Sequence, residues 1–453
     1  MVVLGLGDTG LSMTRWLARK GAQVRVADTR AEPPHAARLA RDLPHVPLVT
    51  GEFGDDTFRD VDSIAISPGL DRRQAPIARA SKRGLALVGD VEIFAQALPR
   101  SRACDARVLA VTGSNGKSTV TAMAGAICRA AGCRTTVAGN IGLPVLDALA
   151  DVEDAAAAPD VFVLELSSFQ LESTVHLAPT AATVLNLSED HLDRYEGMEH
   201  YAAAKSRVFA GEGAQVLNRD DRWSMSMARA GRTIFTFGLS APRADSEWGM
   251  ADAGGEHALV HGQQRLMGLS ELSLTGLHNA ANALAAHALT HALGIPDRAA
   301  VDALRSFEGL PHRVQRVAEV AGVTFYDDSK GTNVGATVAA LSGLGRPVVL
   351  IAGGDGKGQD FAPLGPAVAR HARAVVLIGR DADRIEHALQ GASVPVERAR
   401  NMEQAVAAAH RAAQPGDAVL LSPACASFDM FRDYRHRGET FVAGVRALKQ
   451  EGG

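Results

Sequence analysis

The segment at residues 111–119 has the residue types needed to bind nucleotide phosphates. It reads Val-Thr-Gly-Ser-Asn-Gly-Lys-Ser-Thr, after an apolar run and before a helical pattern. Its two glycines would let backbone N–H groups surround an anion, and the helix start would add the positive end of its dipole. Lys117 would reach the outer phosphates, and Ser118 is placed to ligate Mg²⁺. Val111 replaces the first glycine of G-x-x-x-x-G-K-[ST], so we interpret the segment as a variant phosphate-binding loop.

Carboxylates and an imidazole follow the next apolar runs. Glu165 ends the run 161–165, and Asp190 and His191 come shortly after the run 183–187. Because the carboxyl ends of parallel strands meet at one edge of a sheet, these side chains would lie beside the loop. Carboxylate oxygens suit Mg²⁺, and imidazole is a common metal ligand. A metal site competes here with a simpler interpretation, solvated residues at strand ends.

Lysine usage points to further positions. Only seven of the 47 basic residues are lysines. A lysine kept in so arginine-rich a chain is more often one whose ammonium group arginine cannot replace, although a coding bias would give the same composition. Lys117, Lys330 and Lys357 lie in polar turns that follow apolar runs, whereas Lys205 taken alone predicts a helix-surface lysine.

The N-terminus carries a second nucleotide-binding pattern. Gly5, Gly7 and Gly10 match G-x-G-x-x-G after an apolar run, and Asp28 ends the next run, near the position that bonds a ribose in dinucleotide-binding proteins. An NAD-dependent oxidoreductase is therefore an alternative. The pattern is weak by itself, and a single dinucleotide site would leave the loop at 111–119 unexplained.

The last third of the chain contains three polar turns after apolar runs, at residues 326–333, 352–360 and 421–429. Each lies where open α/β sheets bind ligands, beyond the carboxyl ends of the strands. Cys425 in the third turn has no evident histidine base, so we predict that it packs in the core and is not a nucleophile.

Composition excludes several classes of protein. Apolar residues make up 46% and charged residues 22% of the chain, which excludes a mainly disordered protein. The net charge of −4 gives no bulk electrostatic reason to bind nucleic acid or an anionic membrane. Four cysteines and the lack of long apolar runs predict a reduced, cytoplasmic protein without signal peptide or membrane span.

Apolar runs alternate with amphipathic stretches, which predicts an α/β fold with mostly parallel sheets. Polar, Pro-containing stretches divide the chain into three predicted domains, residues 1–98, 99–310 and 311–453. We expect residues 241–255 to be a surface excursion between strands. Strands are predicted at 2–6, 23–28, 63–67, 108–112, 161–166, 183–187, 324–326, 348–352, 374–378 and 418–421, and helices at 11–19 and 279–293.

Together the motifs resemble those of the Mur ligase family over essentially the whole chain. The shared motifs are the loop at 111–119, Gly139-Asn-Ile-Gly, Glu165-Leu-Ser-Ser-Phe-Gln, Asn186-x-x-x-Asp-His-Leu-Asp193, Leu277-His-Asn-x-x-Asn, Leu310-Pro-His-Arg and Asp328-Ser-Lys. Within the family, the D-glutamate-adding branch is the most similar, through Gly5-Leu-Gly, Asp28-Thr-Arg, Ser67-Pro-Gly, Gly89-Asp-Val-Glu, Gly353-Gly-Asp-Gly-Lys and Leu421-Ser-Pro-Ala-Cys-Ala-Ser.

The resemblance implies a Rossmann-like N-terminal domain that binds a UDP-substrate, a central P-loop-type ATPase domain, and a Rossmann-like C-terminal domain that binds D-glutamate and closes on ATP. The implied enzyme is a monomeric, ATP-dependent ligase that adds D-glutamate to UDP-N-acetylmuramoyl-L-alanine. This reaction supplies peptidoglycan precursors for the cell wall, and so for cell shape and division. A substrate carboxylate would become an acyl phosphate, and attack by the D-glutamate amine would give a tetrahedral intermediate that loses phosphate.

The resemblance also implies roles for individual residues. Lys117, Glu165, His191 and Lys205 would be catalytic. Two Mg²⁺ ions would be held by Ser118 with Glu165 and by His191 with Lys205, the lysine being carbamylated by CO₂. ATP would contact Gly113, Ser114, Asn115, Gly116, Lys117, Ser118, Thr119, Asn279, Asn282, Arg313, Asp328 and Lys330. The UDP-substrate would contact Asp8, Thr9, Asp28, Thr29, Arg30, Gly69, Asn140 and His191, and D-glutamate would contact Thr332, Lys357, Ser427, Phe428 and Tyr434.

Other functions remain open at this point. A folylpolyglutamate-type ligase would share the central loop but not the N-terminal nucleotide domain. Among Mur-type ligases, the diaminopimelate-adding members carry an Asp-Asn-Pro-Arg motif that is absent here, and the alanine-adding members begin with a different Gly-rich loop. A dehydrogenase would need nicotinamide-site residues that we do not find. A non-catalytic nucleotide sensor could lose Lys117 or Glu165, yet both are present.

Overall fold

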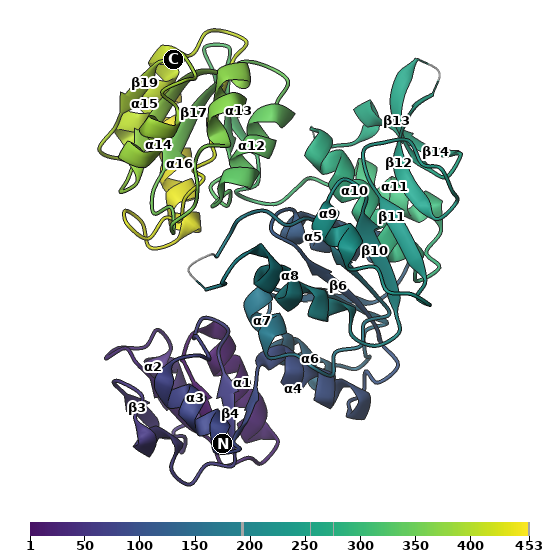
Figure 1. Cartoon of the computed structure of the whole chain (residues 1–453), viewed down its shortest axis with the longest axis vertical. Helices are drawn as coiled ribbons and strands as arrows, with labels where there is room; N and C mark the ends of the chain where they lie inside the picture. The colour runs from purple at the N-terminus through teal and green to yellow at the C-terminus, as the bar shows by residue number, and fades with distance from the viewer. Residues whose placement is uncertain (192–193, 254, 275, 452–453) are drawn as a thin grey trace.

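A computed structural model describes residues 1–191, 194–253, 255–274 and 276–451. It contains three α/β parts along the chain, each built around its own sheet (Figure 1). This confirms the predicted fold class of three α/β domains, whereas the domain limits at residues 98 and 310 stay predictions. No helix in the described residues has the length and apolarity that crossing a membrane requires.

The N-terminal sheet has five parallel strands in the order β3-β2-β1-β4-β5, the order of a Rossmann-type sheet. The helix after β1 lies close to the strand: a Cβ on Gly10 would stand 1.8 Å from the Gly5 carbonyl oxygen, so only glycine fits there. The elements are β1 (Val2–Leu4), α1 (Asp8–Arg19), β2 (Arg25–Asp28), α2 (Ala36–Asp42), β3 (Leu48–Thr50), β4 (Ser63–Ile66), α3 (Ala75–Lys82), β5 (Ala86–Val88) and α4 (Asp90–Ala97).

The central sheet has nine strands in the order β14-β13-β12-β11-β10-β9-β6-β8-β7. It is parallel from β7 to β12 and antiparallel at β13 and β14. Its elements are β6 (Arg107–Thr112), α5 (Lys117–Ala130), β7 (Thr135–Gly139), α6 (Val145–Asp154), β8 (Val161–Glu165), α7 (Ser168–Glu172), β9 (Ala181–Val184), α8 (Met198–Ser206), β10 (Ala214–Asn218), α9 (Arg222–Ser226), β11 (Ile234–Phe237), β12 (Glu247–Ala253), β13 (Glu256–His261), β14 (Gln264–Gly268), α10 (Leu277–His291) and α11 (Asp297–Arg305).

The C-terminal sheet has the order β15-β16-β20-β17-β18-β19 and is parallel except for the edge strand β15. Its elements are β15 (Gln315–Val320), β16 (Val323–Asp327), α12 (Val334–Gly343), β17 (Val348–Gly353), α13 (Leu364–His371), β18 (Ala372–Ile378), α14 (Ala382–Ala388), β19 (Val396–Arg398), α15 (Met402–Ala412), β20 (Ala418–Leu421) and α16 (Tyr434–Glu451). Short 3₁₀ helices lie at Asp55–Phe58, Leu98–Arg100, Arg207–Phe209 and Leu269–Glu271.

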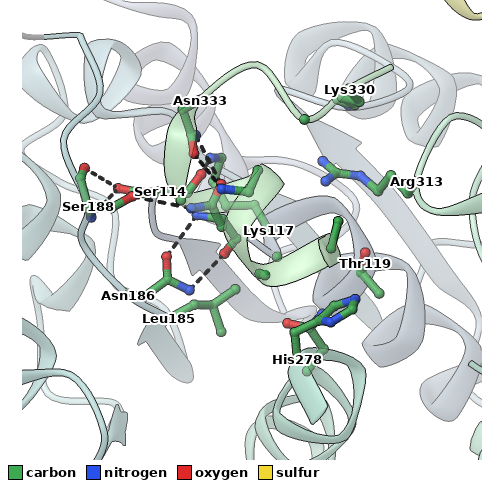
Figure 2. Close-up of a pocket in the computed structure, with 18 of the residues that line it drawn as sticks. Ser114, Lys117, Thr119, Leu185, Asn186, Ser188, His278, Arg313, Lys330 and Asn333 are labelled. Carbon is green, nitrogen blue, oxygen red and sulfur yellow. Dashed lines mark hydrogen bonds between the residues drawn. The ribbon is translucent and has the colours of Figure 1, made fainter. Parts of the chain in front are cut away.

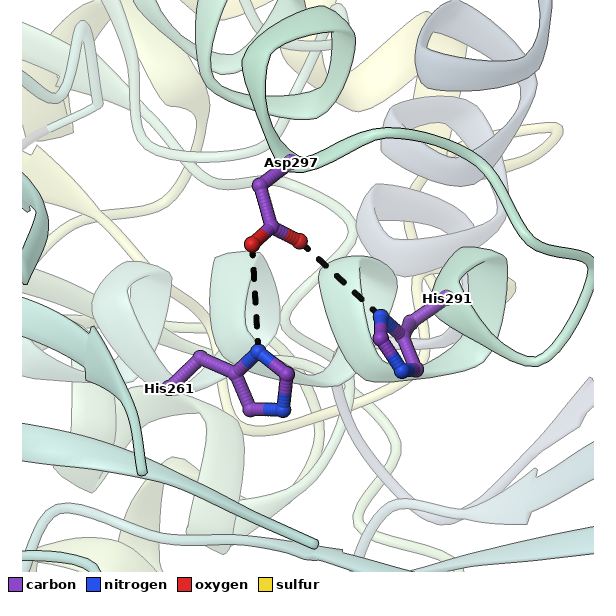
Figure 3. Close-up of side chains that lie close together, drawn as sticks. All are labelled: His261, His291 and Asp297. Atoms are coloured by element: carbon purple, nitrogen blue, oxygen red, sulfur yellow. Dashed lines mark ion pairs between the residues drawn. The ribbon is translucent and has the colours of Figure 1, made fainter. Parts of the chain in front are cut away.

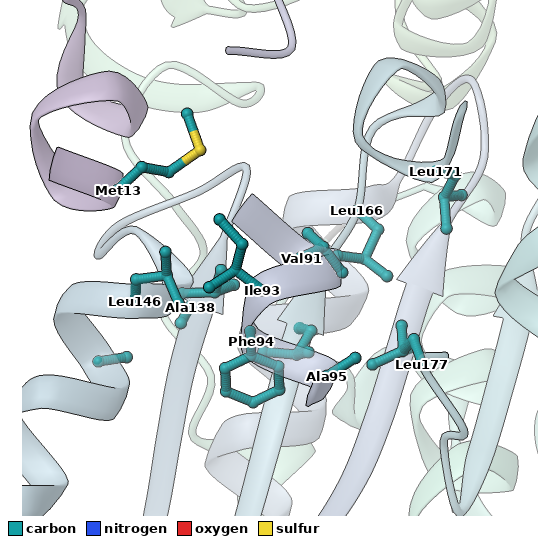
Figure 4. Packing of buried hydrophobic residues seen from close by; sticks show 14 of the residues in the cluster. Met13, Val91, Ile93, Phe94, Ala95, Ala138, Leu146, Leu166, Leu171 and Leu177 are labelled. Atoms are coloured by element: carbon teal, nitrogen blue, oxygen red, sulfur yellow. The ribbon is translucent and has the colours of Figure 1, made fainter. Parts of the chain in front are cut away.

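Strand β8 of the central sheet is apolar and buried from Val161 to Leu164, because both faces of the sheet are covered there. On β8, Phe162 and Leu164 belong to one buried cluster, and Val161 and Val163 belong to another. Helix α4 joins the first of these clusters through Val91, Ile93, Phe94 and Ala95 (Figure 4). The Phe94 ring meets that of Phe162 edge to face at 5.3 Å. Although α4 precedes residue 98, it therefore packs on the central domain.

One local prediction is wrong. Residues 247–253, inside the expected surface excursion, form strand β12, which pairs with β11 and β13. Trp248 drives this pairing because its indole is fully buried and donates a hydrogen bond from Nε1 to His287 Nδ1 at 3.0 Å. Gly249 and Asp252 are residue types that are uncommon in strands, so the sequence pattern does not predict this strand. Cys425 is buried as predicted, and burial raises the pKa of its thiol to about 12.

Candidate active site

The segment between β6 and α5 forms a tight loop. Gly116 has a φ of +82°, and a Cβ there would stand 2.5 Å from Asn282 Oδ1. The positive φ favours glycine, and a Cβ would in addition force the Asn282 amide to move. The Lys117 ammonium group folds over the loop and donates to the carbonyls of Gly113 and Ser114 at 2.9 and 2.8 Å. In this position the ammonium group can exchange those carbonyls for phosphate oxygens.

The chain after β9 holds this loop in place (Figure 2). The predicted strand at 183–187 ends at Val184, and the residues beyond it bond to the loop instead of extending the sheet. Ser114 N–H donates to the Asn186 carbonyl at 2.8 Å, and Asn115 N–H donates to Asn186 Oδ1 at 2.9 Å. Ser188 N–H donates to Ser114 Oγ at 3.1 Å. The site residues chosen from the sequence missed Asn186 and Ser188, although Asn186 opens one of the motifs quoted above.

Glu165 ends β8 beside the loop and is only 1% exposed. Its Oε1 accepts a hydrogen bond from Asn140 at 2.8 Å. Within the described part of the chain, Oε2 is buried without a hydrogen-bond partner. Burial acts to raise the pKa of Glu165, but the charges of Lys117 and Lys330 outweigh it and lower the pKa. A buried, ionised oxygen with a free lone pair fits a cation such as Mg²⁺.

His191 and Asp190 lie next to this carboxylate on the loop after β9. His191 has a φ of +56°, which is unusual for a residue with a side chain, and its ring packs against that of Phe169 at 4.6 Å. Burial lowers its pKa to about 4, so the imidazole is neutral at pH 7 and has a lone pair for a metal. Asp190 pairs with Lys357 of the C-terminal domain at 3.1 Å. Asp193 of the same motif lies outside the described residues.

Lys205 is buried, so its interpretation as a helix-surface lysine is wrong. Its side chain is 1% exposed, and Nζ donates to the Gly113 carbonyl at 2.9 Å and to Thr112 Oγ1 at 3.3 Å. The Tyr201 ring lies 4.8 Å from Nζ. Burial, together with the charge of Lys117, lowers the pKa of Lys205 well below its ordinary value. This shift raises the fraction of the amine that is in its neutral, nucleophilic form.

The C-terminal domain contributes cations to the same loop (Figure 2). Ser118 Oγ accepts hydrogen bonds from Arg313 Nη2 at 2.6 Å and from Lys330 Nζ at 3.3 Å. Asn333 Nδ2 donates to Asn115 Oδ1 at 3.0 Å. The Ser118 hydroxyl therefore faces two positive charges.

These groups surround a cavity of about 500 Å³ between the central and C-terminal domains. Most residues predicted to contact ATP line it, and Asn186, Ser188 and Asn333 join them. Gly113 and Ser118 belong to the same loop without lining the cavity. The predicted lining residues are Ser114, Asn115, Gly116, Lys117, Thr119, Asn279, Asn282, Arg313, Asp328 and Lys330.

A second cavity, of about 460 Å³, adjoins the first. Lys205 lines it, together with all five residues predicted to contact D-glutamate. Phe428 is 74% exposed at its mouth, whereas Ser427 is buried. The two cavities share five lining residues, Lys117, Asn140, His191, Thr332 and Tyr434. The four lysines noted in the sequence, Lys117, Lys205, Lys330 and Lys357, all line one cavity or both.

The residues predicted to bind a UDP group fall into two places. Asn140 and His191 line the cavities, whereas the other six lie at the carboxyl edge of the N-terminal sheet. There Asp28 accepts hydrogen bonds from Leu6 N–H and from the Arg30 guanidinium. Burial opposes ionisation of Asp28, but these bonds lower its pKa to about 2. The remaining predicted residues at this edge are Asp8, Thr9, Thr29 and Gly69. Asp8 Oδ1 lies 2.8 Å from His35 Nε2.

Asp328 carries an unusual carboxyl group, because complete burial raises its pKa to about 7. Its Oδ2 accepts a hydrogen bond from Ser422 Oγ at 2.7 Å. Since the pKa is higher in the folded than in the unfolded chain, protonation stabilises the fold. This contribution is complete below about pH 4 and is lost as the pH rises through about 7.

We therefore expect Asp328→Asn to flatten the pH dependence of stability. The parent protein should lose up to about 4 kcal/mol between pH 4 and pH 8 through this group, and the variant should not. Thermal unfolding of the ligand-free protein across this pH range measures the difference. Equal slopes for the two proteins would show that Asp328 titrates normally.

A phosphate-binding loop, a buried carboxylate beside it and cations reaching in from a second α/β domain define an ATP-dependent ligase of three domains. The chain belongs to the Mur ligase family, whose members form amide bonds with ATP and Mg²⁺. Three family models match successive parts of the chain. They are "Mur ligase MurD-like, N-terminal domain" at residues 1–89, "Mur ligase middle domain" at 111–290, and "Mur ligase, glutamate ligase domain" at 312–425. The resemblance inferred from the motifs is thereby confirmed.

Individual relatives agree with this assignment. The chain is 56% identical to UDP-N-acetylmuramoylalanine--D-glutamate ligase of Methylobacillus flagellatus, over 100% of this chain and 97% of the relative. It is 58% identical to the protein of that name from Thiobacillus denitrificans, over 99% of this chain and 96% of the relative. Among solved structures, the UDP-N-acetylmuramate-alanine ligase of Thermotoga maritima has a TM-score of 0.63 at 19% identity, over 99% of both chains. The structure of MurF from Acinetobacter baumannii has a TM-score of 0.63 at 18% identity, over 99% of this chain and 93% of that chain.

Proposed function

We propose that this protein joins D-glutamate to UDP-N-acetylmuramoyl-L-alanine with the hydrolysis of ATP, in the synthesis of peptidoglycan precursors. The observation that carries the proposal is the meeting of the two cavities at Lys117, Asn140 and His191. A phosphate donor in the first cavity and an amine in the second would reach one acyl group there. The names and identities of the full-length relatives support the same reaction.

The UDP group would bind at the edge of the N-terminal sheet, and the acyl end of the substrate would extend to Asn140 and His191. An elongated substrate accounts for the two separate groups of predicted residues. Because the Asp28 carboxylate is paired with Arg30, its role is to orient the guanidinium, which is half exposed and can bind an anion. This pairing disfavours the ribose-binding role that an NAD-dependent enzyme would give to Asp28.

Activation of the carboxylate begins the reaction. A carboxylate oxygen attacks the γ-phosphorus of ATP, the bond to ADP breaks, and an acyl phosphate forms. Lys117, Arg313 and Lys330 surround the loop and would hold the phosphate oxygens as charge moves from the γ-phosphate to ADP. Burial and the charge of Arg313 lower the pKa of Lys330 to about 8, so most of it is charged at pH 7.

The second step uses the second cavity. The D-glutamate amine attacks the acyl carbon, phosphate leaves, and the nitrogen loses a proton. Lys357 would bind a carboxylate of D-glutamate, and to do so it would exchange its present partner, Asp190. Ser427 and Thr332 offer hydroxyl donors in the same cavity. Closing of the C-terminal domain would bring these groups together, and the hinge at residues 310–314 contains two residues of positive φ, His312 and Val314.

We further propose two Mg²⁺ sites, one at Ser118 and Glu165 and one at His191 and a carbamylated Lys205. Mg²⁺, when bound, offsets negative charge on phosphate and acyl oxygens. The free oxygen of Glu165 and the neutral imidazole of His191 support these sites. The neutral Lys205 amine can attack CO₂ and release a proton, which turns it into an anionic ligand. We expect the enzyme to act as a cytoplasmic monomer.

Phosphate release tests the proposal when the amino acid is varied in the presence of ATP, Mg²⁺ and UDP-N-acetylmuramoyl-L-alanine. We expect fast release with D-glutamate and release at least 100-fold slower with L-alanine or meso-diaminopimelate. L-Alanine lacks the second carboxylate that Lys357 and the hydroxyl groups would bind, and meso-diaminopimelate is longer and carries a second, charged amine. Equal rates with all three amino acids would refute the assignment of D-glutamate. NAD reduction would instead favour a dehydrogenase.

A further inference from the structure

Two histidines and an aspartate lie close together in the central domain (Figure 3). His261 ends β13, His291 ends α10, and Asp297 begins α11. Asp297 Oδ2 lies 3.9 Å from His261 Nδ1, and Asp297 Oδ1 lies 3.9 Å from His291 Nδ1. One ligand atom from each residue falls within 4.8 Å of the other two. All three side chains are only partly exposed, so solvent reaches the group.

The hydrogen bonds around the cluster fix which nitrogens carry lone pairs. His261 Nε2 lies 2.7 Å from the Asp245 carbonyl, which can only accept, so Nε2 carries the proton. The lone pair of the neutral ring is therefore on Nδ1, which faces Asp297. The Trp248 indole stacks on this ring at 3.9 Å and holds its orientation. A backbone carbonyl that orients a histidine in this way is typical of metal ligands.

A third histidine, His287, supports the carboxylate without being a ligand. Its Nδ1 accepts a hydrogen bond from Trp248 Nε1–H, so in the neutral ring the proton is on Nε2. Nε2 lies 3.6 Å from Asp297 Oδ1, in a side chain 2% exposed, and has no hydrogen-bond partner among the described residues. This buried N–H points to the carboxylate and would orient it when the oxygens move toward a cation.

We propose that His261, His291 and Asp297 bind a divalent transition-metal ion of the Zn²⁺ class, with a water molecule at the fourth position. The distances of 3.9 Å are too long for hydrogen bonds. Zinc bonds of about 2.1 Å in tetrahedral geometry place ligand atoms roughly 3.4 Å apart. The three ligand atoms lie within 4.8 Å of one another, so each separation would have to shorten by at most about 1.4 Å to form the site.

The site differs from the catalytic centre in place and in chemistry. Asn279 and Asn282, near the start of α10, line the first cavity, whereas His291 is the last residue of that helix. Imidazole nitrogens select Zn²⁺, Ni²⁺ or Co²⁺ over Mg²⁺, which prefers oxygen ligands. The ion would link β13, α10 and α11, and so fix the helix that carries the two asparagines.

Equilibrium dialysis of the full-length, chelator-treated protein against Zn²⁺ tests the proposal, in saturating Mg²⁺. We expect one bound Zn²⁺ that His291→Gln or Asp297→Asn removes, with at least a 100-fold rise in Kd. Asp297→Asn preserves the size of the side chain, so a folding failure of one variant leaves the other informative. The matched control is His257→Gln, because His257 and Asp252 form an exposed pair on β12 and β13 that has no third ligand among the described residues.

Two further readouts separate this site from the active site. Glu165→Gln alters the catalytic centre and should keep the bound Zn²⁺, whatever its effect on ligation. Co²⁺ should give visible absorption of four-coordinate intensity in the parent protein and in His257→Gln, but not in Asp297→Asn. The proposal is overturned if Zn²⁺ binding is unchanged in both His291→Gln and Asp297→Asn, or if the parent protein binds no Zn²⁺ in the presence of Mg²⁺.

Discussion

Replacing Lys205 with arginine is expected to lower kcat about 10³-fold, as much as replacing it with alanine. Lys205 is buried against the phosphate-binding loop, and the low pKa of its amine favours reaction with CO₂. Arginine keeps a positive charge but cannot become an anionic ligand, so a charge partner of the transition state would be lost in both variants. Steady-state phosphate release, with all substrates saturating, measures the effect.

Short carboxylic acids provide the rescue experiment. Acetate or formate should partly restore the activity of Lys205→Ala, because a small carboxylate can occupy the place of the carbamate. The larger side chain of Lys205→Arg should block that rescue. Lys82→Ala, which changes an exposed lysine on α3, is the control and should retain full activity. If Lys205→Arg is nearly as active as the parent protein, Lys205 acts only as a cation and the carbamate hypothesis is wrong.

Replacing Lys117 with alanine should have a similarly large effect by a different route. We expect kcat to fall about 10³-fold, because this ammonium group lies on the loop and lines both cavities. UDP alone should bind with unchanged affinity, since the residues predicted to contact it lie at the edge of the N-terminal sheet. Calorimetry of UDP binding therefore controls for folding. A variant with normal kcat and a raised KM for ATP would show that Lys117 binds the ground state and transition state equally.

Much of the site could be predicted because its parts are local in sequence. The loop at 111–119 needs glycines, a lysine and a serine in fixed order, and the strand-end position of Glu165 follows from a parallel sheet. Both features appear as short patterns of residue types. The central ATPase architecture and the two cation-bearing turns of the C-terminal domain were predictable for the same reason.

Other features depend on contacts between distant segments. The small residues beside Lys205 in the sequence do not indicate that its amine donates hydrogen bonds to Thr112 Oγ1 and to the Gly113 carbonyl. Likewise, the Asp190–Lys357 ion pair joins two domains, and no local pattern predicts it. Strand β12 depends on the burial of Trp248 against other elements, which the sequence of the strand alone does not indicate. The cluster of His261, His291 and Asp297 combines residues from three elements whose spacing follows no sequence motif.

The central claim is that this site activates a carboxylate as an acyl phosphate before an amide bond forms. An isotope experiment tests it directly: UDP-N-acetylmuramoyl-L-alanine labelled with ¹⁸O in its carboxylate is turned over with ATP, Mg²⁺ and D-glutamate. We predict that each amide bond formed transfers one labelled oxygen from the carboxylate to the released phosphate, as mass spectrometry of the phosphate would measure. Amide formation with unlabelled phosphate would contradict the account.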